Sequence, residues 1–89
     1  MKVYILHETH SDPSLNDHEA FASEGEALKF FEATKQSIDS RHTIEQTYCE
    51  AVDEYFVEVD DYQTIRLYIT EHQLWITLKS NNQFFPDEK

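Results

Sequence analysis

The sequence predicts a small α+β domain of order β-α-α-β-β, with a three-stranded antiparallel or mixed sheet packed on two helices. Three features predict it: an apolar run near the N-terminus, two amphipathic stretches that each follow a capping box, and two stretches of alternating apolar and polar residues. At 89 residues the chain has room for one small core. We therefore expect a single domain over residues 1–80 and a polar C-terminal tail over residues 81–89.

The first strand is expected over residues 2–8. Residues 3–6 (VYIL) form an unbroken apolar run rich in β-forming residues, which is typical of a strand covered on both faces. Residues 9–19 are polar and contain the turn signals DP and ND. We expect this segment to be a long polar loop, a kind of segment that often carries function.

A first helix is expected over residues 24–39. Ser23 and Glu26 form a capping box, in which the Ser23 hydroxyl accepts the N–H of Glu26 and the Glu26 carboxylate reaches back to Ser23. The residues expected on its inner face recur at helical spacing: Ala27, Phe30, Phe31, Thr34 and Ile38.

A second amphipathic helix is predicted by residues 43–61. Thr43 and Gln46 form another capping box at its start, and we expect it to end near residue 56 or 57. Residues 54–59 also fit a strand, because they are rich in β-forming residues and alternate in part. The expected apolar face consists of Ile44, Tyr48, Ala51, Val52, Tyr55, Phe56 and Val59.

A hairpin is expected at residues 63–79. Its two strands, residues 63–70 and 73–79, alternate apolar and polar side chains on either side of residues 71 and 72. Ile65, Leu67 and Ile69 should face the helices. Tyr68 and Trp75 should lie on the sheet face that the helices leave uncovered.

Charge and composition limit the classes of partner. The chain has 18 acidic and 7 basic side chains and a net charge of −11, which repels nucleic acid and anionic lipid and favours a basic protein. No apolar run approaches the about 18 residues of a membrane span. The single cysteine, Cys49, fits a reducing cytoplasm. We therefore expect a cytoplasmic protein that contacts neither nucleic acid nor membrane directly.

The sequence offers no catalytic motif. Gly25 is the only glycine, which excludes the glycine-rich phosphate loops of nucleotide-binding proteins. Acidic neighbours oppose activation of the Cys49 thiol. We expect a non-enzymatic protein without a cofactor.

Partner binding is the class of function that remains. Carboxylates on successive turns of the second predicted helix would lie about 5–6 Å apart, a spacing that imitates the phosphates of a nucleic acid. In size, acidity and lack of a catalytic motif, the chain resembles small phage-encoded inhibitors of host defence, including anti-CRISPR and anti-restriction proteins. The resemblance implies an acidic module that occupies the basic groove of a nucleic-acid-binding enzyme. The expected contact residues are Glu45, Glu50, Asp53, Glu54, Glu58, Asp60 and Asp61.

Two alternatives use other surfaces. Tyr68 and Trp75 on the uncovered sheet face would let the protein self-associate as a homodimer. Histidines and aspartates in and beside the polar loop are possible ligands for a divalent metal, but their spacing matches no closed zinc site, so we do not expect a bound metal. These residues are His7, His10, Asp12 and His18.

Overall fold

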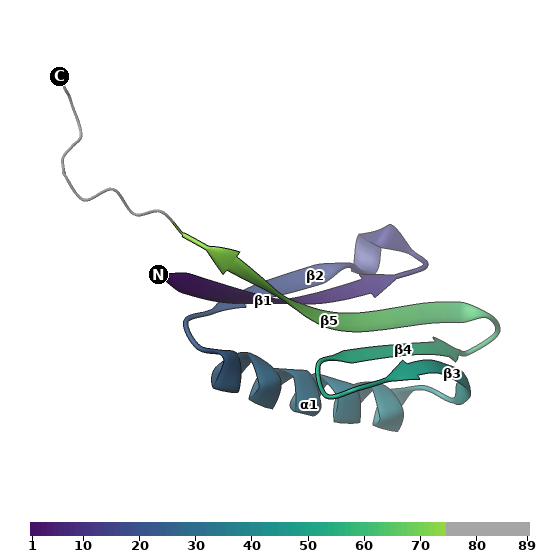
Figure 1. Cartoon of the computed structure of the whole chain (residues 1–89). Coiled ribbons are helices and arrows are strands. Elements are labelled where there is room, and N and C mark those ends of the chain that lie inside the picture. Colours follow the sequence, from purple (N-terminus) through teal and green to yellow (C-terminus); the bar gives the residue numbers. More distant parts are fainter. Residues whose placement is uncertain (75–89) are drawn as a thin grey trace, which may run out of the picture.

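One antiparallel sheet of five strands carries a single α-helix on one face in the computed structural model, which describes residues 1–74 (Figure 1). Within residues 1–74, no helix has both the length and the apolar character needed to cross a membrane. The elements in chain order are β1 (Lys2–His10), the 3-10 helix η1 (Pro13–Leu15), β2 (Asp17–Phe21), α1 (Glu24–Arg41), β3 (Ile44–Glu50), β4 (Glu54–Val59) and β5 (Gln63–Gln73).

The sheet brings distant parts of the chain together. The strand order is β2-β1-β5-β4-β3, and every neighbouring pair is antiparallel. β1 pairs with β5 along its whole length, from Lys2 opposite Gln73 to His10 opposite Ile65. The β1–β2 and β3–β4 hairpins therefore place β2 at one edge of the sheet and β3 at the other.

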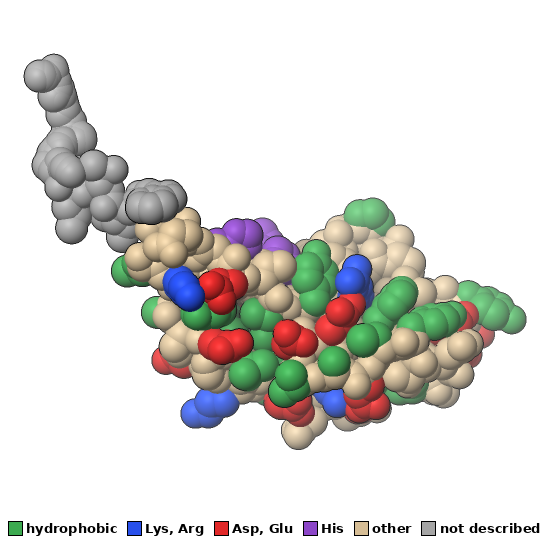
Figure 2. Space-filling model, in the orientation of Figure 1, with side chains coloured by type: hydrophobic (Ala, Val, Ile, Leu, Met, Phe, Trp, Pro, Cys, Tyr) green, Lys and Arg blue, Asp and Glu red, His purple; other side chains and the backbone are tan. Residues whose placement is uncertain are grey.

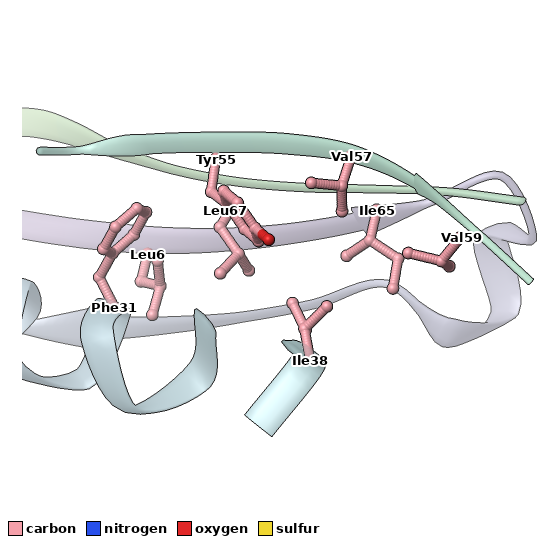
Figure 3. Packing of buried hydrophobic residues seen from close by; sticks show 8 residues of the cluster. All are labelled: Leu6, Phe31, Ile38, Tyr55, Val57, Val59, Ile65 and Leu67. Carbon is pink, nitrogen blue, oxygen red and sulfur yellow. The ribbon is translucent and has the colours of Figure 1, made fainter. Parts of the chain in front are cut away.

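Alternation along the strands determines which residues form the core. Tyr55, Val57 and Val59 of β4 are buried, as are Ile65 and Leu67 of β5, whereas the residues between them are more exposed. Successive side chains of a strand point to opposite faces. One face of the sheet therefore packs against α1 (Figure 3).

The helix α1 begins where the sequence predicts. Ser23 is its N-cap, and the Ser23 hydroxyl accepts the N–H of Glu26 at 3.2 Å. Phe31 and Ile38 are fully buried, and Figure 3 shows both side chains pointing towards the strands. Phe30, which was expected on the same inner face, is 46% exposed. The buried face of α1 is therefore narrower than predicted.

Tyr55 links β4 to α1. Its hydroxyl donates a hydrogen bond to the Asp39 carboxylate at 2.6 Å. Burial and then this hydrogen bond raise the pKa of Tyr55 far above its usual value. Lys35 of α1 lies beside the same ring, with its Nζ 5.1 Å from the ring centroid and 2.7 Å from the Glu50 carboxylate.

The prediction of a second helix is wrong. Residues 44–50 and 54–59 are the strands β3 and β4, so a five-stranded sheet packs on one helix instead of a three-stranded sheet on two. The alternative of a strand at residues 54–59 is confirmed. β4 pairs with β5, which places Tyr55 opposite Leu67 and Val57 opposite Ile65. This pairing buries Val57, which the predicted helical face leaves out.

The predicted hairpin at residues 63–79 is wrong at its turn. β5 continues through Gln73, so Glu71 and His72 lie inside the strand, opposite Tyr4 and Val3 of β1. Most of the second predicted strand, together with Trp75 and the tail, lies outside the described residues. Residues 9–19, expected as a polar loop, contain the end of β1, the short helix η1 and the start of β2.

Candidate functional site

The sheet face opposite α1 is the candidate functional site, and we call it the open face. No element of residues 1–74 lies across it (Figure 1). Figure 2 shows hydrophobic, acidic and basic side chains interspersed on the side of the molecule in view, with histidines gathered along one edge. The side chains that define the open face are His7, His18, Tyr48, Glu54, Phe56, Glu58, Arg66, Tyr68, Thr70 and His72.

One row of the open face crosses four strands. Glu54 of β4 lies opposite Tyr68 of β5, Tyr68 opposite His7 of β1, and His7 opposite His18 of β2. The His7 and Tyr68 rings are stacked, with centroids 4.6 Å apart and an interplanar angle of 11°. Residues opposite each other on antiparallel strands are close enough for their side chains to interact, so the row places these four side chains next to one another across the sheet.

Thr70 connects two histidines of this face. Its hydroxyl lies 2.8 Å from Nε2 of His7 and 2.8 Å from Nε2 of His72. A hydroxyl has one hydrogen to donate and can accept two hydrogen bonds, so at least one of the two rings must donate its Nε2–H to Thr70.

Protonation of His7 is disfavoured by its surroundings. Burial is the larger cause that lowers the pKa of His7, and repulsion from His18 and His72 adds to it. His7 therefore stays neutral to a lower pH than an ordinary histidine. The open face keeps a neutral ring at its centre at pH 7.

Arg66 is the cation of the open face. Its guanidinium carbon lies 4.8 Å from the ring centroid of Tyr68 and 5.9 Å from that of Phe56. Its Nη2 lies 2.6 Å from the Glu54 carboxylate. Tyr48 packs on Phe56 with ring centroids 5.0 Å apart. The result is an aromatic surface around a neutralised ion pair.

The predicted acidic contact residues do not share one helical face, because residues 44–59 form strands. Glu54 and Glu58 lie on the open face, where Glu54 binds Arg66 and Glu58 accepts the Tyr48 hydroxyl at 2.8 Å. Glu50 lies on the opposite side and binds Lys35 of α1. The grouping on a single helix surface is wrong, while binding of a basic partner by these carboxylates stays a prediction.

The remaining acidic candidates cluster at the two turns of the β3–β4–β5 meander. Asp53 precedes β4 in an exposed turn, and its carbonyl accepts the N–H of Ile69 at 3.3 Å. Asp60 binds the His42 ring, and its carboxylate also accepts the N–H of Thr43 at 3.0 Å. The hydrogen bond from His42 and then that from Thr43 lower the pKa of the Asp60 carboxyl.

The β4–β5 turn has an unusual backbone. Asp60, Asp61 and Tyr62 have φ values of 41°, 63° and 72°. Residues other than glycine rarely adopt this left-handed conformation, which costs on the order of 1–3 kcal/mol at each position. The Glu45 carboxylate holds the turn by accepting the N–H groups of Asp61 and Tyr62, each at 3.4 Å. Glu45 and Asp61, both predicted as contact residues, therefore lie together at this turn.

The four possible metal ligands do not converge on one site, although His7 and His18 lie opposite each other. His7 faces Thr70, and His10 binds Glu8 with 2.5 Å between Nε2 and Oε2. Asp12 caps η1 by accepting the N–H of Ser14 at 3.1 Å. Within residues 1–74, no group of three His, Cys, Asp or Glu residues is arranged to hold a metal ion.

The sequence pattern predicted Tyr68 on the uncovered sheet face but did not predict Tyr48, Phe56 or His7 there. Tyr48 and Phe56 were assigned to the buried face of a helix, and His7 was considered only as a metal ligand. The alternation of residues 55–59 is the signal that could have placed the Phe56 side chain on the other face of the strand from Tyr55 and Val57. The alternation of residues 63–70 places Arg66 on the same face as Tyr68, but it gives no sign that Arg66 contacts Phe56 of β4.

No protein-family model, curated protein or solved structure matches this chain.

Proposed function

We propose that the chain is a non-enzymatic protein-interaction module that pairs with a second copy of itself through the open face. The observation that carries this proposal is the aromatic, nearly neutral sheet face on a strongly acidic molecule. Aromatic side chains on an uncovered sheet face, with polar groups around them, are typical of interaction sites. The partner is a second copy because the charge distribution favours self-pairing at this face.

Two copies with a net charge of −11 repel each other over most of their surfaces. On β1, β2, β4 and β5, alternation places one positive charge on the open face, from Arg66, and two negative charges, from Glu54 and Glu58. With neutral histidines this part of the face sums to −1. It is therefore a region where two copies can approach with little repulsion.

The charges of the open face also suit two-fold symmetry. A two-fold interface places the same patch against itself. A patch with charges of both signs can then bring Arg66 of one copy near the carboxylates of the other. The aromatic rings of Phe56 and Tyr68 would supply the apolar contact at its centre.

The size of the face predicts a weak dimer. Strands lie about 4.8 Å apart and rise about 3.4 Å per residue, so five strands of about six residues span roughly 20 by 20 Å. Two such faces remove on the order of 1,000 Å² from solvent, which is near the lower limit for a specific interface. We therefore expect a reversible dimer that dissociates on dilution.

The test is sedimentation equilibrium of the full chain and two variants with the same added charge. Tyr68→Glu places a carboxylate at the centre of the open face. Tyr62→Glu places one at the β4–β5 turn, where Tyr62 is 83% exposed. We expect wild type and Tyr62→Glu to dimerise alike and Tyr68→Glu to remain monomeric, with circular dichroism used to check that each variant is folded.

Tyr48→Glu provides a second variant if Tyr68→Glu fails to fold. Tyr48 is 50% exposed on the edge strand β3, so a carboxylate there leaves the core intact. A wild-type chain that stays monomeric up to millimolar concentration would contradict the proposal. Equal weakening by the substitutions at positions 62 and 68 or 48 would reduce the effect to net charge.

A further inference from the structure

The edge strand β2 forms one wall of a groove against α1. β2 pairs with β1 on one side, and no other strand of residues 1–74 lies on its outer side. An unpaired strand edge presents backbone N–H and C=O groups that can pair with another chain. Phe21 at the end of β2 packs against Phe30 of α1, with ring centroids 5.4 Å apart. The groove therefore lies between the free edge of β2 and the side of α1 that carries Phe30.

Two hollows meet at Phe30. One has a volume of about 420 Å³ and is lined by Phe21, Phe30 and Ala33, with Glu26 and Lys29 of opposite charge also in its lining. The side chain of Phe30 is half exposed there. This end of the groove is therefore apolar and electrically balanced.

The second hollow is small, about 30 Å³, and acidic. Three of its seven lining residues are acidic. The lining consists of Leu6, Glu8, Asp17, His18, Glu19, Phe30 and Thr34. Register places Asp17 opposite Glu8, so their side chains share one face of the sheet. Among the ion pairs of the described residues, Glu8 binds His10, and neither Asp17 nor Glu19 has a cationic partner.

The geometry points to binding of an extended basic segment of another protein, added as a strand to β2 with its alternate side chains in this groove. Pairing with a sheet edge supplies backbone hydrogen bonds, and pockets for alternate side chains supply specificity. Residues two apart on a strand are about 6.8 Å apart. An apolar side chain over Phe30 and a Lys or Arg two residues further would meet the apolar hollow and the carboxylates of Asp17 and Glu19.

Charge decides between this partner and a second copy. Another β2 edge would bring its own Asp17 and Glu19 against those of the first copy, and like charges directly opposite destabilise a strand pair. A basic segment instead gains charge complementarity from the same residues. This inference uses the β2 edge and the helix side of the sheet, so it does not depend on dimerisation through the open face.

The test is fluorescence anisotropy with labelled ten-residue peptides that alternate Thr with side chains of chosen type. The first peptide carries Leu and Lys two positions apart. The second replaces Lys by Glu, and the third carries N-methyl groups that block strand pairing along one edge. We expect the first peptide to bind, the second to bind at least about tenfold more weakly, and the third to lose binding.

Two double variants distinguish an effect of the groove carboxylates from an effect of net charge alone. Asp17→Asn with Glu19→Gln removes two charges from the groove, and Glu32→Gln with Glu71→Gln removes two charges from exposed positions elsewhere. We expect about fivefold weaker binding of the Lys peptide by the first variant and less than twofold by the second. Equal weakening by both variants, binding by the N-methylated peptide, or no binding of the Lys peptide at 1 mM would overturn the inference. Dimerisation measured on the same samples reports separately on the open face.

Discussion

The protonation state of His7 affects the stability of the folded sheet. Its ring stacks on Tyr68 and bonds to Thr70, while His18 and His72 stand near enough to oppose a positive charge on it. Folding therefore favours the neutral ring. The stabilisation that depends on the neutral ring is full above the ordinary pKa of histidine and is lost as the pH falls through the lowered pKa of the folded state.

The lowered pKa of His7 predicts how the stability of the protein depends on pH. The free energy of unfolding of the wild type should decrease as the pH falls from 7 to 5, in part because His7 must be protonated against its surroundings. His7→Gln removes the titrating group, so its stability should depend less steeply on pH even if its stability at pH 7 is lower. Urea unfolding at a series of pH values measures both slopes. Identical slopes for the two proteins would show that His7 is not perturbed by folding.

The β4–β5 turn makes a second prediction at the scale of one residue. Tyr62 has a φ of 72° and an almost fully exposed side chain, so its backbone is strained while its ring contributes little packing. Tyr62→Gly should relieve the strain and raise the free energy of unfolding by about 0.5–1 kcal/mol after the entropy cost of glycine. Thermal or urea unfolding measures the change. Tyr62→Ala is the matched control, because it removes the ring and keeps the strain, and should not stabilise; equal gains from both variants would contradict the assignment.

At the scale of elements, signals within one stretch of sequence were enough to predict α1. They wrongly predicted a helix in place of β3 and β4, because pairing with distant strands determines the structure there. The start of α1 is set by the Ser23 cap and by helical spacing within the same stretch. In residues 43–61, apolar residues also recur at helical spacing, but their side chains contact partners far away in the chain. Tyr55 and Val57 lie opposite Leu67 and Ile65, and this burial outweighs the local pattern.

The difference between patterns within one strand and pairing between distant strands also explains how much of the site could be predicted. Tyr68 was placed on the uncovered face because β5 alternates clearly on its own. The stacking of His7 on Tyr68 depends on the register between β1 and β5, which no feature within either strand encodes. Phe56 and Arg66 likewise meet only after β4 pairs with β5. The residues of the open face were therefore visible in part, but not their arrangement.

The two predicted caps give a test at this scale. Ser23→Ala removes a side-chain cap and should lower the free energy of unfolding by about 0.5–2 kcal/mol. Thr43→Ala should change it by less than about 0.5 kcal/mol, because Thr43 is exposed and contributes its backbone N–H to Asp60. Urea unfolding of both variants makes the comparison. A loss from Thr43→Ala as large as that from Ser23→Ala would indicate a second helix.

At the scale of the molecule, charge and shape divide the surface into regions with different partners. The net charge of −11 repels other copies over most of the surface, while the open face is aromatic and close to neutral. The edge at β2 combines uncompensated carboxylates with an apolar hollow. One face thus suits a second copy, and the edge suits a basic segment.

Salt distinguishes these two modes. Raising NaCl from 50 to 500 mM shortens the screening length from roughly 14 to roughly 4 Å, which weakens repulsion between the two acidic copies. We expect the dimer to tighten by about three- to tenfold, whereas binding of the Lys peptide should weaken. Sedimentation equilibrium and anisotropy at each salt concentration measure the two constants. A dimer that weakens with salt would contradict pairing through a nearly neutral face.

Amide chemical shifts of the isotopically labelled full chain over a dilution series would show whether two copies meet through the open face. Each resonance reports its own position in the sheet, so the measurement locates the interface as well as detecting it. We expect concentration-dependent shifts centred on His7, Phe56 and Tyr68, with little change at Phe30 or Tyr62. Shifts confined to α1 and β2, or none up to 1 mM, would contradict it.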